Sequence, residues 1–169
     1  MLEIAVQREN PWAEIDWEAL AGAAVRAAFD ESPYGEWVEH HSTFEISVRL
    51  TSDAEVQHLN RHYRDKDKPT NVLSFPMVQR DLLDTVSLNS DDGEVLLGDI
   101  VLAHGVCMAE AVERRVAVEA HAQHLIVHGT LHLLGFDHEM DAEAEAMEAM
   151  ERAALVALGL HDPYPVRED

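Results

Sequence analysis

Three histidines near the end of an apolar segment have the spacing of a metal site. His128 and His132 are four residues apart, and His138 follows six residues later, beyond Gly135. Residues four apart on a helix lie on one face, one turn apart, and a glycine lets the chain reverse so that a third imidazole returns to them. Catalytic zinc typically has three protein ligands and an open fourth position. The spacing therefore predicts one Zn²⁺ ion bound by His128, His132 and His138.

The predicted site favours an anionic substrate. Three neutral ligands leave a charge of about +2 at the ion, which lowers the pKa of coordinated water toward roughly 7. The spacing also matches that of the metzincin proteases, but Gly129 stands where those enzymes have a catalytic glutamate. Peptide hydrolysis needs a base and a proton donor, and glycine supplies neither. Phosphodiester cleavage depends mainly on charge stabilisation, so it is the favoured reaction.

The charge of the chain opposes a polyanionic substrate except in one segment. The formal net charge is -21, and a field of that sign repels nucleic acid. In residues 58–72, which we call the basic segment, four cations and two aspartates give +2, against -23 for the rest of the chain. The cations are Arg61, Arg64, Lys66 and Lys68. A guanidinium binds phosphate through two parallel hydrogen bonds, which makes Arg64 a candidate phosphate ligand.

The length of 169 residues predicts a single domain over residues 1–169. The apolar periodicity predicts an α+β fold, with a small mixed sheet of about four strands packed with helices. The expected strands are 2–7, 43–50, 71–75 and 95–102. Helices are expected after Asp16, after a capping box formed by Ser52 and Glu55, over 105–134 and over 141–158. The third of these reads as one long central helix that ends at Gly135 and carries the metal site with the turn that follows. Residues 87–93 form a polar loop.

Composition places the chain among globular proteins of a reducing compartment. Hydrophobic residues make up 47% and charged residues 27%, which is near the globular average. The first ten residues lack a hydrophobic signal core, and no apolar run is long enough to span a bilayer. Cys107 is the only cysteine, so no internal disulfide can form. We expect a cytoplasmic protein with no membrane partner.

The remaining histidines and the last helix favour structural roles. His121 and His124 precede His128 on the same segment and are most simply packed polar residues, with an orienting role left open for His124. Four glutamates of the last helix are expected to form a solvated face: Glu143, Glu145, Glu148 and Glu151.

Three motifs, taken together, resemble those of the bacterial YbeY proteins. They are NRHYRDKDKPTNVLSFP at 60–76, LGDIV at 97–101 and HGTLHLLGFDH at 128–138. The motifs follow one another along the chain in the same order as in that family. The YbeY proteins are single-strand-specific metalloendoribonucleases that act in ribosomal RNA maturation. Phe136 is a departure, because the family usually has tyrosine at this place.

The resemblance implies an α+β fold, a zinc ion on His128, His132 and His138, and assistance by Arg64 at the phosphate, with His128 and Arg64 in the catalytic centre. It further implies maturation of the 3′ end of 16S ribosomal RNA, ribosome quality control, and a ribosomal subunit or ribosomal protein as partner. The nucleophile stays open between water and a ribose hydroxyl. Two alternatives also stay open: a zinc hydrolase of peptides or small molecules, and a non-catalytic ribosome assembly factor with structural zinc.

Overall fold

A computed structural model gives the structure of the protein and describes residues 1–39, 42–79, 82–83, 94–137 and 141–160. The elements within these residues follow in chain order. They are β1 (Leu2–Arg8), α1 (Trp17–Glu31), the 3-10 helix η1 (Gly35–Glu39), β2 (Thr43–Thr51), α2 (Asp53–Arg64), β3 (Val72–Pro76), β4 (Glu94–Ala103), α4 (His104–Arg114), α5 (Val118–Leu133) and α6 (Asp141–Ala157). None of the helices in this described part of the chain is long and apolar enough to cross a membrane. The predicted loop 87–93 lies outside it.

The four strands form one mixed sheet in the order β1-β2-β4-β3. β1 and β2 are parallel, as are β2 and β4, whereas β3 is antiparallel to β4 and lies at the edge of the sheet. All four predicted strands are confirmed to within one residue at each end. The predicted α+β class with a small mixed sheet is therefore confirmed.

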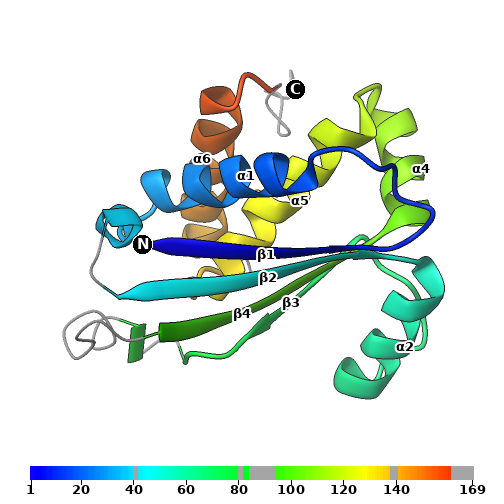
Figure 1. Ribbon diagram of the computed structural model, residues 1–169, viewed down its shortest axis with the longest axis horizontal. Coiled ribbons are helices and arrows are strands. Elements are labelled where there is room, and N and C mark those ends of the chain that lie inside the picture. Colours follow the sequence, from blue (N-terminus) through cyan, green and yellow to red (C-terminus); the bar gives the residue numbers. More distant parts are fainter. Residues whose placement is uncertain (40–41, 80–81, 84–93, 138–140, 161–169) are drawn as a thin grey trace.

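Helices cover both faces of the sheet. Along β4, Ile100 and Leu102 belong to the main core, whereas the alternate residues Val101 and Ala103 belong to a second, smaller core. Successive side chains of a strand point to opposite faces, so β4 is buried on both sides. Figure 1 shows α1, α5 and α6 on one face of the sheet and α2 on the other. The edge strand β3 contacts α5 of the first layer and α2 of the second.

The predicted helix starts have the expected caps. The side chain of Asp16 accepts a hydrogen bond from the backbone N–H of Ala19 at 3.1 Å, at the start of α1. The Ser52 hydroxyl likewise accepts from the N–H of Glu55 at 3.2 Å, at the start of α2. Such caps satisfy N–H groups that have no partner within the helix. The Ser52 cap fixes the start of the helix that ends at Arg64.

The expected single helix over 105–134 is wrong in its continuity, because the structure has two helices there. α4 ends at Arg114, and Arg115 adopts the left-handed conformation with φ of 59°. The backbone N–H of Val116 then bonds to the carbonyl of Ala111 at 3.0 Å, which closes the helix end. A non-glycine residue makes this stop, so neither Gly nor Pro marks it in the sequence. The end of α5 is as expected, with Gly135 at φ of 89°.

Gly98 allows β4, β3 and α5 to approach closely, and its replacement should destabilise the fold. Gly98 has φ of 149°, and a Cβ there would overlap the carbonyl oxygen of Phe75 and lie 2.8 Å from Cδ2 of Leu133. We expect Gly98→Ala to lower the free energy of unfolding by about 1–3 kcal/mol, measured by urea denaturation. Gly22→Ala is the matched control, because a Cβ at Gly22 would meet only an arginine side chain at 3.6 Å. Equal stability of the two variants would contradict this account.

Candidate metal centre

His128 and His132, the two predicted ligands on α5, are partly exposed in a stretch of the helix that is otherwise buried. From His121 to Leu134 every residue is buried except His128 and His132. The side chain of His128 is 22% exposed. A helix whose remaining residues are packed in the interior holds these imidazoles in fixed positions, while their exposed parts stay open to a ligand from solvent.

The imidazoles of His128 and His132 face each other. Their Nε2 atoms are 3.0 Å apart, and their ring centroids are 4.5 Å apart at an interplanar angle of 79°. Two imidazoles on one tetrahedral zinc ion, each bound at about 2.0–2.1 Å, place their nitrogens about 3.3 Å apart. The observed separation differs from that value by a few tenths of an ångström. The pair therefore fits two positions on a single zinc ion.

The third predicted ligand, His138, lies outside the described residues. Within the part of the chain that the structure describes, no group of three His, Cys, Asp or Glu side chains is placed to hold a metal ion. Cys107 is buried, and burial raises the pKa of its thiol to about 12. A thiol binds metal as the thiolate, so Cys107 is a packed residue. The three-histidine ligand set remains a prediction.

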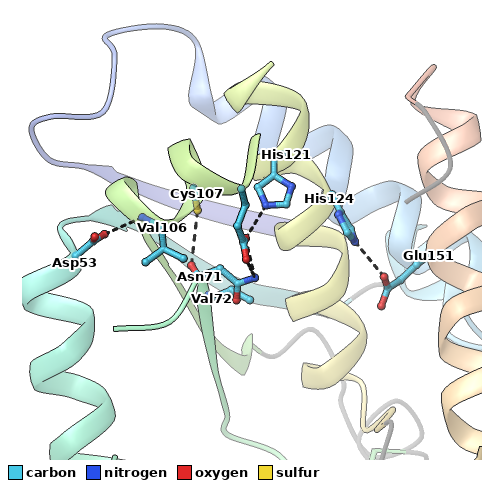
Figure 2. A network of polar contacts seen from close by, with 9 residues as sticks. Asp53, Asn71, Val72, Val106, Cys107, His121, His124 and Glu151 are labelled. Carbon is cyan, nitrogen blue, oxygen red and sulfur yellow. Dashed lines mark hydrogen bonds and ion pairs between the residues drawn. The ribbon is translucent and has the colours of Figure 1, made fainter. Parts of the chain in front are cut away.

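A buried carboxylate on α6 connects two of the α5 histidines. Glu151 is 1% exposed, and its Oε1 lies 2.5 Å from Nδ1 of His128. Its Oε2 lies 3.2 Å from Nε2 of His124. Figure 2 shows His124 pointing from α5 toward Glu151 on α6. The expectation that Glu151 belongs to a solvated face is wrong, because Glu151 shares the buried side of α6 with Met147, Ala154 and Leu155.

The ionised state of Glu151 determines which ring nitrogen of His128 carries the proton. Burial alone would raise this pKa, but hydrogen bonds with His124 and His128, together with their charges, lower it to about 2. The carboxylate is therefore ionised near neutral pH and can only accept hydrogen bonds. Nδ1 of His128 must then carry the proton. In the neutral imidazole this leaves the lone pair on Nε2, the atom that faces His132.

A second polar network lies at the start of β3 (Figure 2). Glu110 of α4 accepts a hydrogen bond from the side chain of Asn71 at 3.0 Å and lies 2.8 Å from Nε2 of His121. Burial is the main cause that lowers the pKa of His121, so this histidine is neutral at pH 7. The structural role expected for His121 agrees with these contacts. Between this network and His128 lies a pocket with a volume of about 120 Å³. Its walls are Asn71, Val72, Arg114, His121, His124, Leu125 and His128.

Gly129 lies in close contact with the sheet. A Cβ at this position would lie 2.9 Å from Cγ2 of Ile100 and 3.0 Å from the hydroxyl of Ser74. The space that a metzincin-type glutamate would need is thus filled by β3 and β4. Packing against the sheet therefore requires glycine at position 129, and the glycine in turn leaves the site without a catalytic base at that position.

Arg64, the predicted phosphate ligand, also contacts β3. It is the last residue of α2, and its Nη2 donates a hydrogen bond to the carbonyl oxygen of Ser74 at 2.7 Å. Its guanidinium also lies over the ring of Phe75, 5.6 Å from the centroid. Ser74 thus contacts Arg64 through its carbonyl and adjoins Gly129 through its hydroxyl. Arg64 and Gly129, the residue after His128, thus both adjoin Ser74 of the edge strand β3.

Comparison with known proteins identifies the family. The family model described as Endoribonuclease YbeY matches residues 4–159 of this chain. The chain belongs to the YbeY family. The protein named Endoribonuclease YbeY from Rhizorhabdus wittichii is 60% identical to it, over 100% of this chain and 100% of its own. The protein of the same name from Sphingopyxis alaskensis is 54% identical, over 97% of this chain and 98% of its own. The protein of that name from Zymomonas mobilis is 44% identical, over 99% of this chain and 96% of its own. The resemblance of the three motifs to YbeY is thereby confirmed.

A solved structure supports the fold of this YbeY chain. The solution structure of TM1509 from Thermotoga maritima superposes with a TM-score of 0.53 and covers 98% of this chain and 100% of its own. The two sequences are 23% identical, so this likeness concerns the fold alone.

Glu151→Gln should change both stability and the proton position on His128. The amide removes the negative charge that both imidazoles contact, so we expect the free energy of unfolding to fall by about 1–3 kcal/mol. In the unmodified protein, nitrogen NMR of the histidine side chains should show His128 protonated at Nδ1. In the variant, we expect a mixture of tautomers. Glu145→Gln, at an exposed position on the same helix, is the control, and an Nε2-protonated His128 in the unmodified protein would refute the assignment.

Proposed function

We propose that this protein is a zinc-dependent endoribonuclease that cleaves single-stranded RNA. The observation that carries the proposal is the pair of facing imidazoles on His128 and His132, 3.0 Å apart at Nε2, in a chain of the Endoribonuclease YbeY family. The proposed biological role is maturation of the 3′ end of 16S ribosomal RNA together with ribosome quality control, in the cytoplasm. A ribosomal subunit or ribosomal protein is the proposed partner.

The proposed metal ligands are His128, His132 and His138. Zinc bound there would supply positive charge for the developing negative charge of the phosphate and would lower the pKa of water. Within the protein, Glu151 keeps the proton of His128 on Nδ1 and so keeps the lone pair of Nε2 directed toward His132. The buried contacts of Glu151 with His124 and His128 also tie α6 to the ligand helix.

Arg64 is proposed to bind the phosphate. A guanidinium has five N–H donors in a fixed plane, and the hydrogen bond to the Ser74 carbonyl uses one of them. That bond fixes the orientation of the group at the edge of β3, while the side chain remains exposed. Donors held in place before the reaction stabilise charge without reorganisation. Arg64 would thereby add positive charge at the edge strand β3, which also adjoins the helix that carries His128 and His132.

A peptide substrate is disfavoured by the packing at Gly129. Peptide hydrolysis requires a base beside the metal, and the position that carries this base in the metzincins is filled by Ile100 and Ser74. A structural zinc in an assembly factor is the other alternative. It differs from the proposal in predicting that the protein folds with zinc but does not cleave RNA.

Replacing Arg64 should separate catalysis from metal binding. We expect Arg64→Ala to lower kcat for single-stranded RNA by about 10²–10³-fold, as for the loss of one transition-state donor, with zinc content unchanged. His128→Ala and His132→Ala should lose the zinc as well as the activity. Arg26→Ala, which removes an equally charged and exposed side chain from α1, is the control. Equal zinc loss in the Arg64 and histidine variants would contradict the separate roles.

Zinc removal should abolish cleavage reversibly. We expect chelation to stop cleavage of single-stranded RNA and stoichiometric zinc to restore it, with metal content and cleavage followed in the same preparation. Unchanged cleavage after complete removal of the metal would refute the zinc-dependent mechanism. Tight zinc binding without any RNA cleavage would support the structural alternative.

A further inference from the structure

Tyr63 presents a large aromatic ring at the surface of α2. Its exposed fraction is 65%. In the structure only Val56 and Asn60 of this helix are buried. The position next to Arg64 therefore carries an aromatic side chain that contributes little to the core.

Neighbouring rings hold Tyr63 in place. It makes an edge contact with Phe75 of β3, with ring centroids 5.4 Å apart at 64°, and another with His62 at 4.6 Å and 86°. His62 in turn lies parallel to His58, with centroids 6.3 Å apart at 14°. We call these four residues, His58, His62, Tyr63 and Phe75, the aromatic cluster. Ordering a ring before it binds reduces the entropy lost on binding.

The aromatic cluster lies within positive charge. His58, His62 and Tyr63 belong to the basic segment, whose four cations are all exposed. Arg64 follows Tyr63 directly, and its guanidinium lies over the same Phe75 ring that Tyr63 contacts. The candidate phosphate ligand and the exposed ring are thus joined through one residue of β3.

We propose that Tyr63, supported by His62 and Phe75, stacks on a nucleobase of single-stranded RNA next to the phosphate bound by Arg64. The inference rests on the proposed function, because it concerns the same substrate. Proteins that bind single-stranded nucleic acid combine cationic side chains along the backbone with aromatic side chains under the bases. A base must be unpaired and unstacked to lie on such a ring, so this contact selects single strands over duplexes.

Stacking would also add RNA affinity that the negatively charged protein does not gain from electrostatic attraction. The net charge of -21 repels RNA at long range, and the basic segment offsets this only locally. Contact between a ring and a base does not depend on the net charge, so it adds affinity where electrostatics supplies little. The excess of cations around the ring favours an anionic partner and therefore RNA over an acidic protein surface.

The test compares Tyr63→Ala with Tyr63→Phe in the zinc-loaded, full-length protein, using a mixed-sequence single-stranded RNA. We expect Tyr63→Ala to raise KM by about 5- to 160-fold, the range for loss of one stacked base, with a much smaller change in kcat. Tyr63→Phe, which keeps the ring, should restore most of the affinity. Zinc content should be the same in all variants. Val112→Ala is the control, because Val112 is 74% exposed and lies on α4.

A substrate series with one abasic nucleotide at each position gives the decisive comparison. One abasic position should raise KM for the unmodified protein and leave that of Tyr63→Ala almost unchanged. In the variant the ring that stacks on this base is already absent, so removing the base costs nothing further. A purely structural role of Tyr63 would leave the abasic effects equal in the two proteins, and an unchanged KM of Tyr63→Ala would point to another partner. Either result overturns the stacking inference while the proposed function stands. Failure of the zinc-loaded unmodified protein to cleave any of these RNAs would overturn both.

Discussion

The close contact between α5 and the sheet at Gly129 is the constraint on which the arrangement of the candidate site depends. Because no side chain stands there, the helix lies directly against Ile100 and Ser74. This packing places His128, the preceding residue, beside the edge strand β3. The same strand provides the carbonyl that anchors Arg64. The contact of Gly129 with the sheet and the hydrogen bond from Arg64 to Ser74 thus together set the relation between the imidazoles and the guanidinium.

The second organising feature is a charge inside the protein. Isolated buried carboxylates are costly, and they persist when hydrogen bonds and opposite charge compensate for lost hydration. Glu151 has both in His124 and His128, and its pKa is lowered to about 2 despite burial. The consequence reaches the surface of α5, because the carboxylate determines which nitrogen of His128 faces His132. The C-terminal helix is thereby part of the candidate centre, although the recognisable motifs end before it.

Features coded by neighbouring residues could be predicted from the sequence. The caps at Asp16 and Ser52 and the four strands depend on local patterns, and the facing pair His128 and His132 follows from helical spacing. The break at Arg115 could not be predicted, because a residue without special backbone freedom makes it. The residue type of Glu151 predicts a surface position, although Glu151 follows Met147 by four residues and thus continues the apolar stripe of α6. Its partners lie 23 and 27 residues away in the chain, and no local pattern contains them.

X-ray absorption spectroscopy of the zinc-loaded protein tests most directly whether the histidines form an open catalytic site. We expect three imidazole nitrogens and one further light-atom ligand at about 2.0–2.1 Å from zinc, as in catalytic sites with an exchangeable fourth position. A sulfur ligand, fewer than three imidazoles, or a closed shell of four protein ligands would contradict it.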